Sequence, residues 1–310
     1  MVSLPPIKTL FFGTHNFATA ILKGLIDSPF IEVVGVVTQP DKPAGRHHEV
    51  AESPVKKLAR KKLIPIFQPT SLNNFDISPF RDYDLFIVCQ YGLIIPKNVL
   101  DTPKQGSVNV HASLLPKYRG ASPIQYALIN GEKETGITII LMDEKMDHGP
   151  ILAQDKIAIA ADDTHNALSE KLAKLGNDLL IKTIPDWVEG KIVPQEQDHA
   201  QATFTKILKR DDGRISFDKT AEQIYNLYRG LTPWPGIWTM WEGKRIKLLR
   251  IKPTDETIEP GLVVIKNASI YIGCASGSIQ ALELQMEGKK AMDARIFLQG
   301  YTKIAGAKVE

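Results

Sequence analysis

Two hydrophobic patterns alternate along the first two thirds of the chain. Short apolar runs at 7–12, 31–38 and 85–90 have the length and composition of buried strands. Between and after them, apolar residues recur at helical spacing, as in 17–26 and in the long stretch 166–189. Because strands that alternate with helices imply right-handed crossovers, this pattern predicts a mainly parallel sheet. The first part of the chain is therefore expected to be an α/β domain.

Further strands and one basic helix complete the pattern, at 64–67, 107–111, 138–142, 151–159 and 54–62. The stretch 39–53 contains Pro40, Pro43 and Gly45, so we expect a loop there, neither helix nor strand. The polar, unperiodic stretch 190–210 has the character of a linker.

Beyond this linker, short strands lie close together and are separated by Gly, Pro and Asn. They are expected at 245–251, 261–266, 269–274 and 278–286. This spacing indicates a small β-rich barrel. We therefore predict a first domain at 1–190, a linker at 191–207 and a second domain at 208–310.

The composition is that of an ordinary globular protein. In 310 residues, 43% are hydrophobic and 24% charged, which excludes disorder and a fibrous repeat. Cys89 and Cys274 fall in predicted strands far apart, so neither a disulfide framework nor a zinc finger is expected, and a reducing cytosol fits best. No secretory leader or membrane-length apolar run is recognisable. We expect a cytoplasmic protein with no membrane association.

The positive charge belongs to the last third of the chain. Residues 1–204 contain 21 basic and 23 acidic side chains, whereas residues 205–310 contain 17 and 12. An excess of this size is compatible with a nucleic-acid-facing module, although by itself it is common.

Candidate catalytic groups cluster in two places. Asn109 and His111 are two apart on a predicted strand, so they project from the same face. A second polar cluster, 142–150, follows another strand and contains Asp147. An amide, an imidazole and a carboxylate can therefore converge. On spacing alone, an equally good interpretation is that His111 is a hydrogen-bonded core histidine and that Asp147 is a turn residue ahead of Gly149.

The first of these readings is favoured by a resemblance. Asn109-x-His111, the Ser-Leu-Leu-Pro-x-Tyr-Arg-Gly run at 113–120 and Asp147-x-Gly149 together resemble the folate-dependent formyltransferases. Other segments extend the likeness over nearly the whole chain, at 12–14, 40–46 and 91–96. In the back third, segments at 212–215, 233–236 and 288–292 resemble the C-terminal domain of the tRNA-directed members of that family.

The resemblance implies a Rossmann-like formyltransferase domain joined to an OB-like domain. It implies formyl transfer from 10-formyltetrahydrofolate, without a metal, to the amino group of methionyl initiator tRNA, and we take a monomer as the default. In that chemistry Asn109 and His111 donate to the oxyanion and Asp147 removes the proton from the amine.

The resemblance also implies binding residues. Those on the folate side are Ser113, Leu114, Leu115, Pro116, Tyr91, Gly92 and Leu93, and for Leu114 and Leu115 simple core filling is the alternative. Those on the acceptor side are Gly13, Thr14, Lys42, Arg46, Lys206, Lys209 and Arg210. The chain departs from the family pattern at His15, Asn16, His47, His48 and Glu49. These departures concern the acceptor rather than the reaction class.

Two other functions remain open. In the first, the acceptor is an amino sugar nucleotide, because formyltransferases that act on such sugars share the catalytic trio. In the second, the chain is a catalytically silent RNA-binding homologue. Metal catalysis is not expected, because no pair of histidines has helical spacing with a glutamate between them and no cysteine ligand set exists. Gly13 also lacks the further glycines of a dinucleotide-binding turn.

Overall fold

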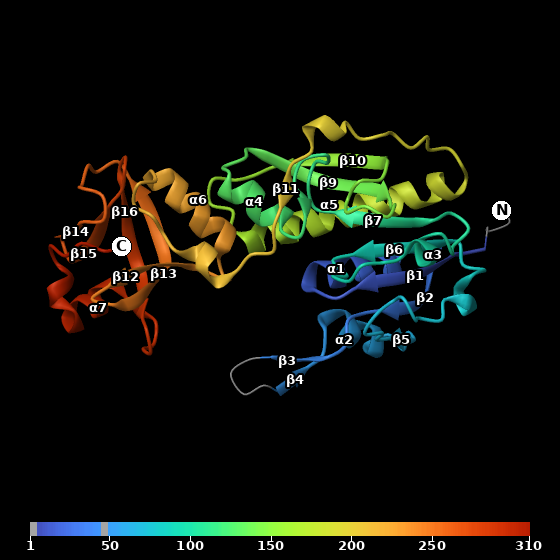
Figure 1. Cartoon of the computed structure of the whole chain (residues 1–310), viewed down its shortest axis with the longest axis horizontal. Helices are drawn as coiled ribbons and strands as arrows, with labels where there is room; N and C mark the ends of the chain where they lie inside the picture. The colour runs from blue at the N-terminus through green and yellow to red at the C-terminus, as the bar shows by residue number, and fades with distance from the viewer. Residues whose placement is uncertain (1–4, 45–48) are drawn as a thin grey trace. The chain divides into compact units, whose positions relative to one another are not determined.

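The computed structural model describes residues 5–44 and 49–310, so Arg46, His47 and His48 lie outside the described residues (Figure 1). The chain packs into two compact units. Unit 1 comprises residues 1–120, 134–157 and 169–204, and unit 2 comprises 121–133, 158–168 and 205–310. Two inserts, 121–133 and 158–168, therefore pack with the C-terminal third. The boundaries predicted above, at 190 and 208, stay predictions for independently folding domains.

Unit 1 is built on a seven-stranded sheet of order β10-β9-β7-β6-β1-β2-β5. Its strands are β1 (Ile7–Gly13), β2 (Ile31–Val37), β5 (Ile66–Phe67), β6 (Leu85–Cys89), β7 (Ser107–His111), β9 (Glu134–Leu141) and β10 (Ile151–Ala158). The pairs β1–β2, β1–β6, β2–β5 and β6–β7 are parallel, whereas β7–β9 is antiparallel. The central strands are continuous apolar runs because both of their faces are covered. The predicted mainly parallel sheet is confirmed.

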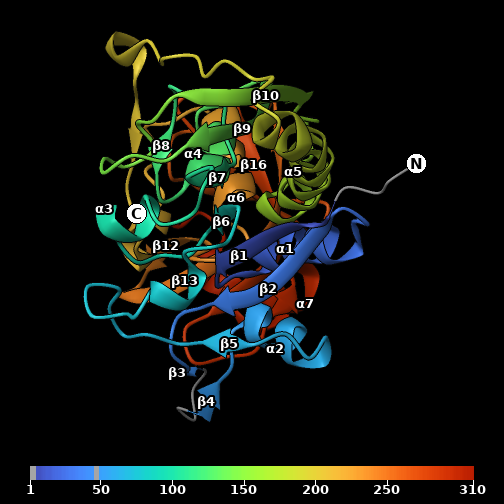
Figure 2. The same ribbon diagram turned by 90° about the vertical axis from the view of Figure 1, so that its right-hand side faces the viewer.

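Two helices, α1 (Asn16–Asp27) and α5 (His165–Val188), cover one face of this sheet (Figures 1 and 2). They approach closely, because Gly24 leaves room for Asn177, whose side chain donates to the Ala20 carbonyl (2.9 Å). Gly176 of α5 lies against Val110 of β7. Val110 therefore faces the helices, and its neighbours in β7 face the other side of the sheet.

The predicted loop 39–53 contains regular structure. β3 (Lys42–Ala44) and β4 (Glu49–Ala51) pair as short antiparallel strands, so the expectation of a structureless loop is wrong. Pro43, which lies opposite Val50, does not prevent pairing, because proline is tolerated where its missing N–H is not needed in the ladder. After it come α2 (Pro54–Lys61), whose N-cap Ser53 accepts from Lys56, and α3 (Lys97–Leu100).

Unit 2 contains an antiparallel sheet of order β12-β13-β16-β15-β14, with β17 paired to β16. Its strands are β12 (Ile237–Trp241), β13 (Lys244–Thr254), β14 (Val263–Lys266), β15 (Ser269–Gly273), β16 (Ser278–Met286) and β17 (Met292–Asp293). Helices α4 (Pro123–Ile129), α6 (Ala221–Leu231) and α7 (Ala294–Gly300) belong to the same unit. One buried apolar cluster joins the sheet to α6 and α7. The predicted small β domain is confirmed.

Short pieces complete the chain. The remaining strands are β8 (Arg119–Gly120) and β11 (Phe204–Thr205), and single 3-10 turns lie at Ser78–Phe80, His199–Gln201, Arg210–Gly213 and Thr302–Ile304. Among the helices of residues 5–44 and 49–310, none is both long and apolar enough to cross a membrane.

Candidate active site

Strand β7 carries the first two candidate residues. Val108 and Val110 are buried on the face toward α5, so the alternation of the strand turns Asn109 and His111 to the opposite face. His111 is 5% exposed, and Asn109 is partly buried. The sequence prediction that these two side chains share a face is confirmed.

Asp147 reaches β7 from a loop that folds back over the sheet. Because β7 and β9 run antiparallel, Leu141 at the end of β9 lies opposite Val108, at the beginning of β7. The loop after Leu141 closes on itself, since the Leu141 N–H donates to the Pro150 carbonyl (2.9 Å). Asp147 therefore meets His111 because the loop returns along the sheet, whereas the sequence suggested only that two strand ends lie close together.

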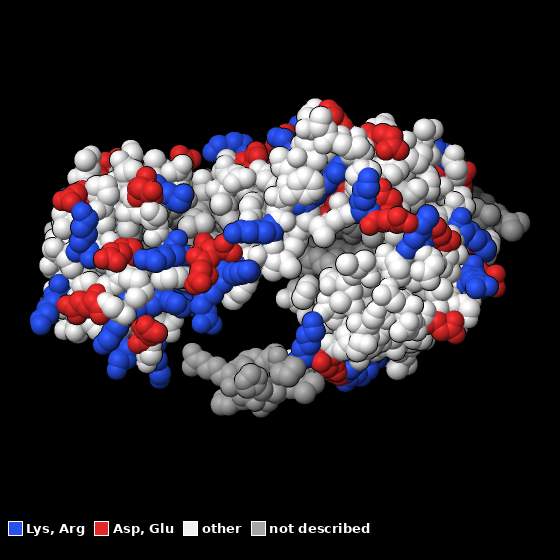
Figure 3. Space-filling model, in the orientation of Figure 1, with Lys and Arg blue, Asp and Glu red and all other residues white. Residues whose placement is uncertain are grey.

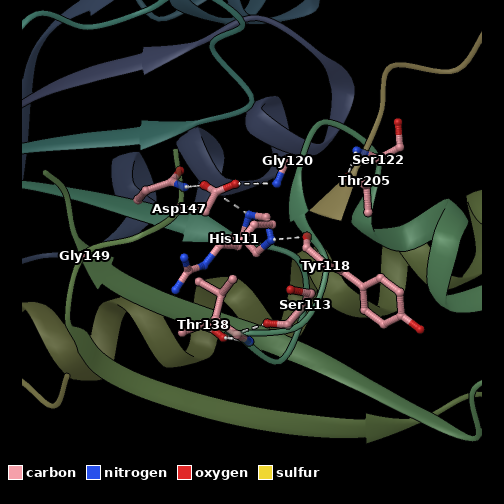
Figure 4. Close-up of polar contacts among 12 residues, drawn as sticks. His111, Ser113, Tyr118, Gly120, Ser122, Thr138, Asp147, Gly149 and Thr205 are labelled. Atoms are coloured by element: carbon pink, nitrogen blue, oxygen red, sulfur yellow. Dashed lines mark hydrogen bonds and ion pairs between the residues drawn. The ribbon is translucent and has the colours of Figure 1, made fainter. Parts of the chain in front are cut away.

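The Asp147 carboxylate is the centre of a small polar cluster (Figure 4). Its Oδ1 accepts from Asn109 Nδ2 (3.2 Å) and lies 3.5 Å from His111 Nδ1. Its Oδ2 accepts from the Gly120 N–H (2.7 Å). The side chains of His111 and Asp147 are 6% and 12% exposed, so their interactions are largely shielded from water.

Both ring nitrogens of His111 face acceptors. Nε2 lies 3.0 Å from the Tyr118 carbonyl, and Nδ1 faces the Asp147 carboxylate. The Asp147 carboxylate offers about four lone-pair positions, of which three face Asn109 Nδ2, His111 Nδ1 and the Gly120 N–H. One position therefore stays available to a substrate proton, and one hydrogen of Asn109 Nδ2 stays available to a developing oxyanion.

The segment after β7 is held by buried hydrogen bonds within itself and to Thr138 of β9. Ser113 is fully buried, and its Oγ donates to the Lys117 carbonyl (2.7 Å). Its carbonyl accepts from Thr138 Oγ1 (2.6 Å), which in turn accepts from the Leu115 N–H (3.1 Å). Leu115 is 4% exposed and Leu114 packs against Gly136. Leu115 therefore belongs to the buried core, whereas Leu114 and Pro116 are partly buried.

The second group of predicted folate residues is split between core and surface. Tyr91 is 2% exposed and packs edge-on against Phe12, and burial raises the pKa of its hydroxyl to about 12. Its carbonyl accepts from Thr14 Oγ1 (2.9 Å) and Gln39 Nε2 (2.8 Å). Gly92 is exposed and Leu93 partly buried. Only these last two present side-chain or backbone surface to a ligand.

The predicted acceptor residues of unit 1 that the structure describes lie at the end of β1 and in β3. Gly13 is tightly packed, since a Cβ there would lie 2.9 Å from Ala18 and 3.0 Å from the Cys89 carbonyl. Lys42 is exposed, and its Nζ donates to Gln39 Oε1 (2.8 Å). His15 precedes α1 without capping it through its side chain.

The predicted acceptor residues of unit 2 are exposed cations. Lys206 pairs with Asp212 (2.8 Å), and this hydrogen bond raises the pKa of the lysine. Lys209 and Arg210 flank the same aspartate, which accepts from the Lys209 N–H (2.6 Å). Figure 3 shows Lys and Arg side chains crowded on the visible surface of this unit.

Two buried residues support the Asp147 turn. Arg119 lies in the 113–120 run, whereas Gln197 was not singled out from the sequence. Gln197 and Arg119 are 5% and 4% exposed, and they hydrogen-bond to each other. Gln197 also donates to the carbonyls of Asp147 and Gly149. Gln197 lies in the stretch interpreted as a linker, so that stretch is not a free tether here.

Both cysteines of the chain are buried. Cys89 is fully buried and burial raises the pKa of its thiol, so the thiolate is disfavoured. Cys274 is also buried and unpaired. Within 5–44 and 49–310, no three His, Cys, Asp or Glu side chains are grouped as metal ligands.

Replacing Gly149 by alanine should damage the turn that holds Asp147. A Cβ at this position would lie 1.9 Å from the Leu141 carbonyl oxygen, which is backbone and cannot rotate away. We expect a loss of about 1–3 kcal/mol in the free energy of unfolding. Thermal unfolding measures it, with Gly300→Ala as the control, because nothing lies within 4 Å of a Cβ there. Equal melting temperatures for both variants would contradict this geometry.

Family models match both parts of the chain. A model described as "Formyl transferase" matches residues 7–184, and one described as "Formyl transferase, C-terminal domain" matches residues 207–302. The first includes Asn109, His111 and Asp147, and the second includes most of unit 2.

Relatives of similar length share about two fifths of the sequence. A methionyl-tRNA formyltransferase of Geobacter sulfurreducens is 39% identical over 307 residues, covering 98% of this chain and 96% of the relative. A methionyl-tRNA formyltransferase of Acidobacterium capsulatum is 42% identical over 303 residues, covering 96% of this chain and 97% of the relative.

Solved structures with the same fold are more distant in sequence. An N-formyltransferase from Helicobacter canadensis, in complex with folinic acid and dTDP-3-aminofucose, matches with a TM-score of 0.66 and 20% identity over 89% of this chain and 98% of that one. HypX from Aquifex aeolicus in complex with tetrahydrofolic acid matches with a TM-score of 0.61 and 14% identity, over 96% of this chain and 48% of that one. These likenesses show the fold alone. With both family models matched and relatives aligned along nearly its whole length, the chain belongs to the formyl transferase family.

Proposed function

We propose that this protein transfers the formyl group of 10-formyltetrahydrofolate to the free amino group of methionyl initiator tRNA. The observation that carries the proposal is the likeness to methionyl-tRNA formyltransferases over 96–98% of the chain, which includes the basic C-terminal unit. The convergence of Asn109, His111 and Asp147 supports the reaction type. We further propose that the enzyme acts in the cytoplasm as a monomer.

Asp147 is proposed to accept the proton of the attacking amine. An α-amino group titrates near ~8, so near pH 7 much of it must lose a proton before it attacks the formyl carbon. The Asp147 carboxylate has an unused lone-pair position, while His111 and Gly120 hold its two oxygens. The new bond joins the amino nitrogen to the formyl carbon. The bond from that carbon to the folate nitrogen then breaks, and the second proton of the amino nitrogen passes to the leaving folate nitrogen, while the first leaves Asp147 for solvent.

Asn109 is proposed to stabilise the tetrahedral oxyanion. One hydrogen of its Nδ2 goes to Asp147 Oδ1, which fixes the plane of the amide and aims the other hydrogen away from the carboxylate. The His111 ring is almost completely buried, and its Nδ1 faces the Asp147 carboxylate, so it holds this carboxylate in place beside the reacting atoms. Direct donation by His111 would require Nδ1 to leave Asp147, so we place this residue mainly behind the carboxylate.

The donor site is proposed to use backbone and apolar surface. The buried hydrogen bonds of Ser113 and Thr138 fix the backbone that follows His111, and this backbone is then available to a pterin ring. Gly92 and Leu93 border the same side of the sheet, at the end of β6, which pairs with β7. In this arrangement Ser113, Leu115 and Tyr91 act by holding the wall rather than by touching the folate with their side chains.

One assay tests the acceptor. The protein is incubated with 10-formyltetrahydrofolate and, in parallel, with charged initiator tRNA, charged elongator tRNA and an amino sugar nucleotide, and release of tetrahydrofolate is followed. We expect rapid release with the initiator alone. Release only with the sugar nucleotide would make the chain a sugar formyltransferase, and no release with any acceptor would make it a silent RNA-binding homologue.

The three cations at the beginning of the 205–310 segment of unit 2 should contribute to tRNA affinity. Changing Lys206, Lys209 and Arg210 together to glutamine removes three charges from an exposed segment. We expect tRNA binding to weaken and the slope of log K against log salt to become shallower by about 2, because fewer counterions are released. A triple variant of the exposed Lys23, Lys174 and Lys182 in unit 1 is the charge-matched control. An unchanged salt slope in the first triple variant would remove this segment from the tRNA site.

A further inference from the structure

A buried carboxamide lies directly behind the turn that carries Asp147. Gln197 Nε2 donates to the carbonyls of Asp147 (2.9 Å) and Gly149 (2.7 Å). Its Oε1 accepts twice from the Arg119 guanidinium, from Nε at 3.2 Å and from a terminal nitrogen at 2.6 Å. A carboxamide has two donor hydrogens and two acceptor lone pairs, so all four positions are used. A side chain satisfied in this way has a single orientation.

The hydrogen bonds around Asp147 form a closed ring. The Gly120 N–H donates to the Asp147 carboxylate (2.7 Å), and Arg119, the preceding residue, reaches the Asp147 carbonyl through Gln197. The side chain and the backbone of Asp147 are therefore both fixed relative to the same dipeptide. Arg119 also donates to Nδ1 of His199 (2.8 Å). This second hydrogen bond fixes the position of the Arg119 guanidinium.

The backbone of this turn requires external support. Asp147 has a φ of 50°, in the left-handed region that residues other than glycine adopt rarely. On one side the turn is limited by the Leu141 carbonyl, which leaves no room for a Cβ at Gly149. On the other side the two hydrogen bonds from Gln197 hold it. Without Gln197 the two carbonyls lose buried partners, and Asp147 is free to relax toward a commoner conformation.

We propose that Gln197 is a positioning residue that sets the direction of the Asp147 carboxylate. The inference rests on the proposed function, because it assigns Gln197 to the proton transfer made by Asp147. A displacement of about 1 Å in a catalytic group lowers turnover by roughly a hundredfold. Loss of the two donor hydrogens of Gln197 is therefore expected to lower kcat by about 10- to 100-fold. KM for either substrate should change by less than about threefold, since Gln197 is 5% exposed and its polar atoms are all used within the protein.

Two variants of Gln197 separate its contacts. Gln197→Glu keeps the oxygen that accepts from Arg119 and loses both hydrogens that are donated to the turn. Gln197→Ala loses the acceptor and both donors. Gln195→Ala is the matched control, because Gln195 is an exposed glutamine two residues away that joins Ile151 through backbone hydrogen bonds (2.7 and 2.9 Å). Arg119→Lys gives an independent variant of the same ring, and it takes over the comparison where a Gln197 variant does not fold.

The experiment measures kcat and KM for each variant in the wild-type chain and in an Asp147→Asn background. We expect the loss in kcat to be 10- to 100-fold in the wild-type chain and less than about threefold in the Asp147→Asn background, where no base remains to be positioned. A merely structural role would lower kcat by the same factor in both backgrounds, and that result overturns the proposal. An unaffected Gln197→Glu in a working enzyme overturns this inference alone. A wild-type chain that transfers no formyl group overturns the proposed function and this inference with it.

Discussion

Replacing Asp147 by asparagine is expected to lower kcat for formyl transfer by about 10²- to 10⁴-fold. The substitution keeps the size of the side chain and its place between Asn109, His111 and Gly120. It removes the negative charge and the lone pair that would take the proton from the amine. It also turns an amide NH₂ toward groups that themselves donate, so at least one donor loses its partner.

The measurement is steady-state turnover with saturating folate donor and charged initiator tRNA, together with the affinity for each substrate. Asp155→Asn is the control, because Asp155 is exposed on β10 and its carboxylate accepts from the neighbouring Lys156 N–H (2.8 Å). Turnover of Asp147→Asn within tenfold of wild type would show that another group, or solvent, removes the proton.

Replacing Asn109 by alanine is expected to lower kcat by about 10²- to 10³-fold, with little change in folate affinity. The amide is the side chain on β7 that keeps a hydrogen available after its bond to Asp147 (3.2 Å). Its stabilisation of the oxyanion develops only in the transition state, so binding of the substrates should be preserved. Asn98→Ala, at an exposed position of α3, is the matched control.

A second comparison separates two roles of Asn109. If Asn109 only holds Asp147, its loss should have little further effect in an Asp147→Asn background. If it binds the oxyanion, the two losses in kcat should multiply. We expect them to multiply, and equal turnover of Asn109→Ala and wild type would remove this residue from the mechanism altogether.

The strands of the sheet and the face shared by Asn109 and His111 were predictable because they depend on local alternation. The apolar runs of β1, β2 and β6 and the polar–apolar alternation of β7 need no knowledge of distant contacts. Helix α6 was not predicted, although Thr220 and Gln223 form a capping box at its N-terminus. That signal is readable from a sequence, and its threonine and glutamine lie three residues apart as the motif requires.

The return of the 142–150 loop across β7 was not predictable from strand order. A strand that ends in a polar loop indicates where chemistry begins, but it does not indicate whether its neighbour is parallel or antiparallel. Here β9 reverses direction, and Asp147 approaches His111 only because Leu141 and Pro150 close the loop.

Gln197 escaped prediction for a similar reason. Its partners are backbone carbonyls 48 and 50 residues earlier in the chain and the guanidinium of Arg119, 78 residues earlier, and carbonyls leave no mark in a sequence. In a polar stretch without periodicity, a buried glutamine looks the same as a solvated one. The same limit applies to Tyr91, whose predicted place near the folate gave no hint that its ring lies in the core.

A crystal structure of the protein with a formyl-bearing folate in place would decide whether Asn109 and Asp147 act on the formyl group. We expect the formyl oxygen to lie about 3 Å from Asn109 Nδ2 and the Asp147 carboxylate to face the side from which an amine would approach. A folate bound elsewhere, or a formyl group out of hydrogen-bonding reach of both Asn109 and Asp147, would contradict these roles.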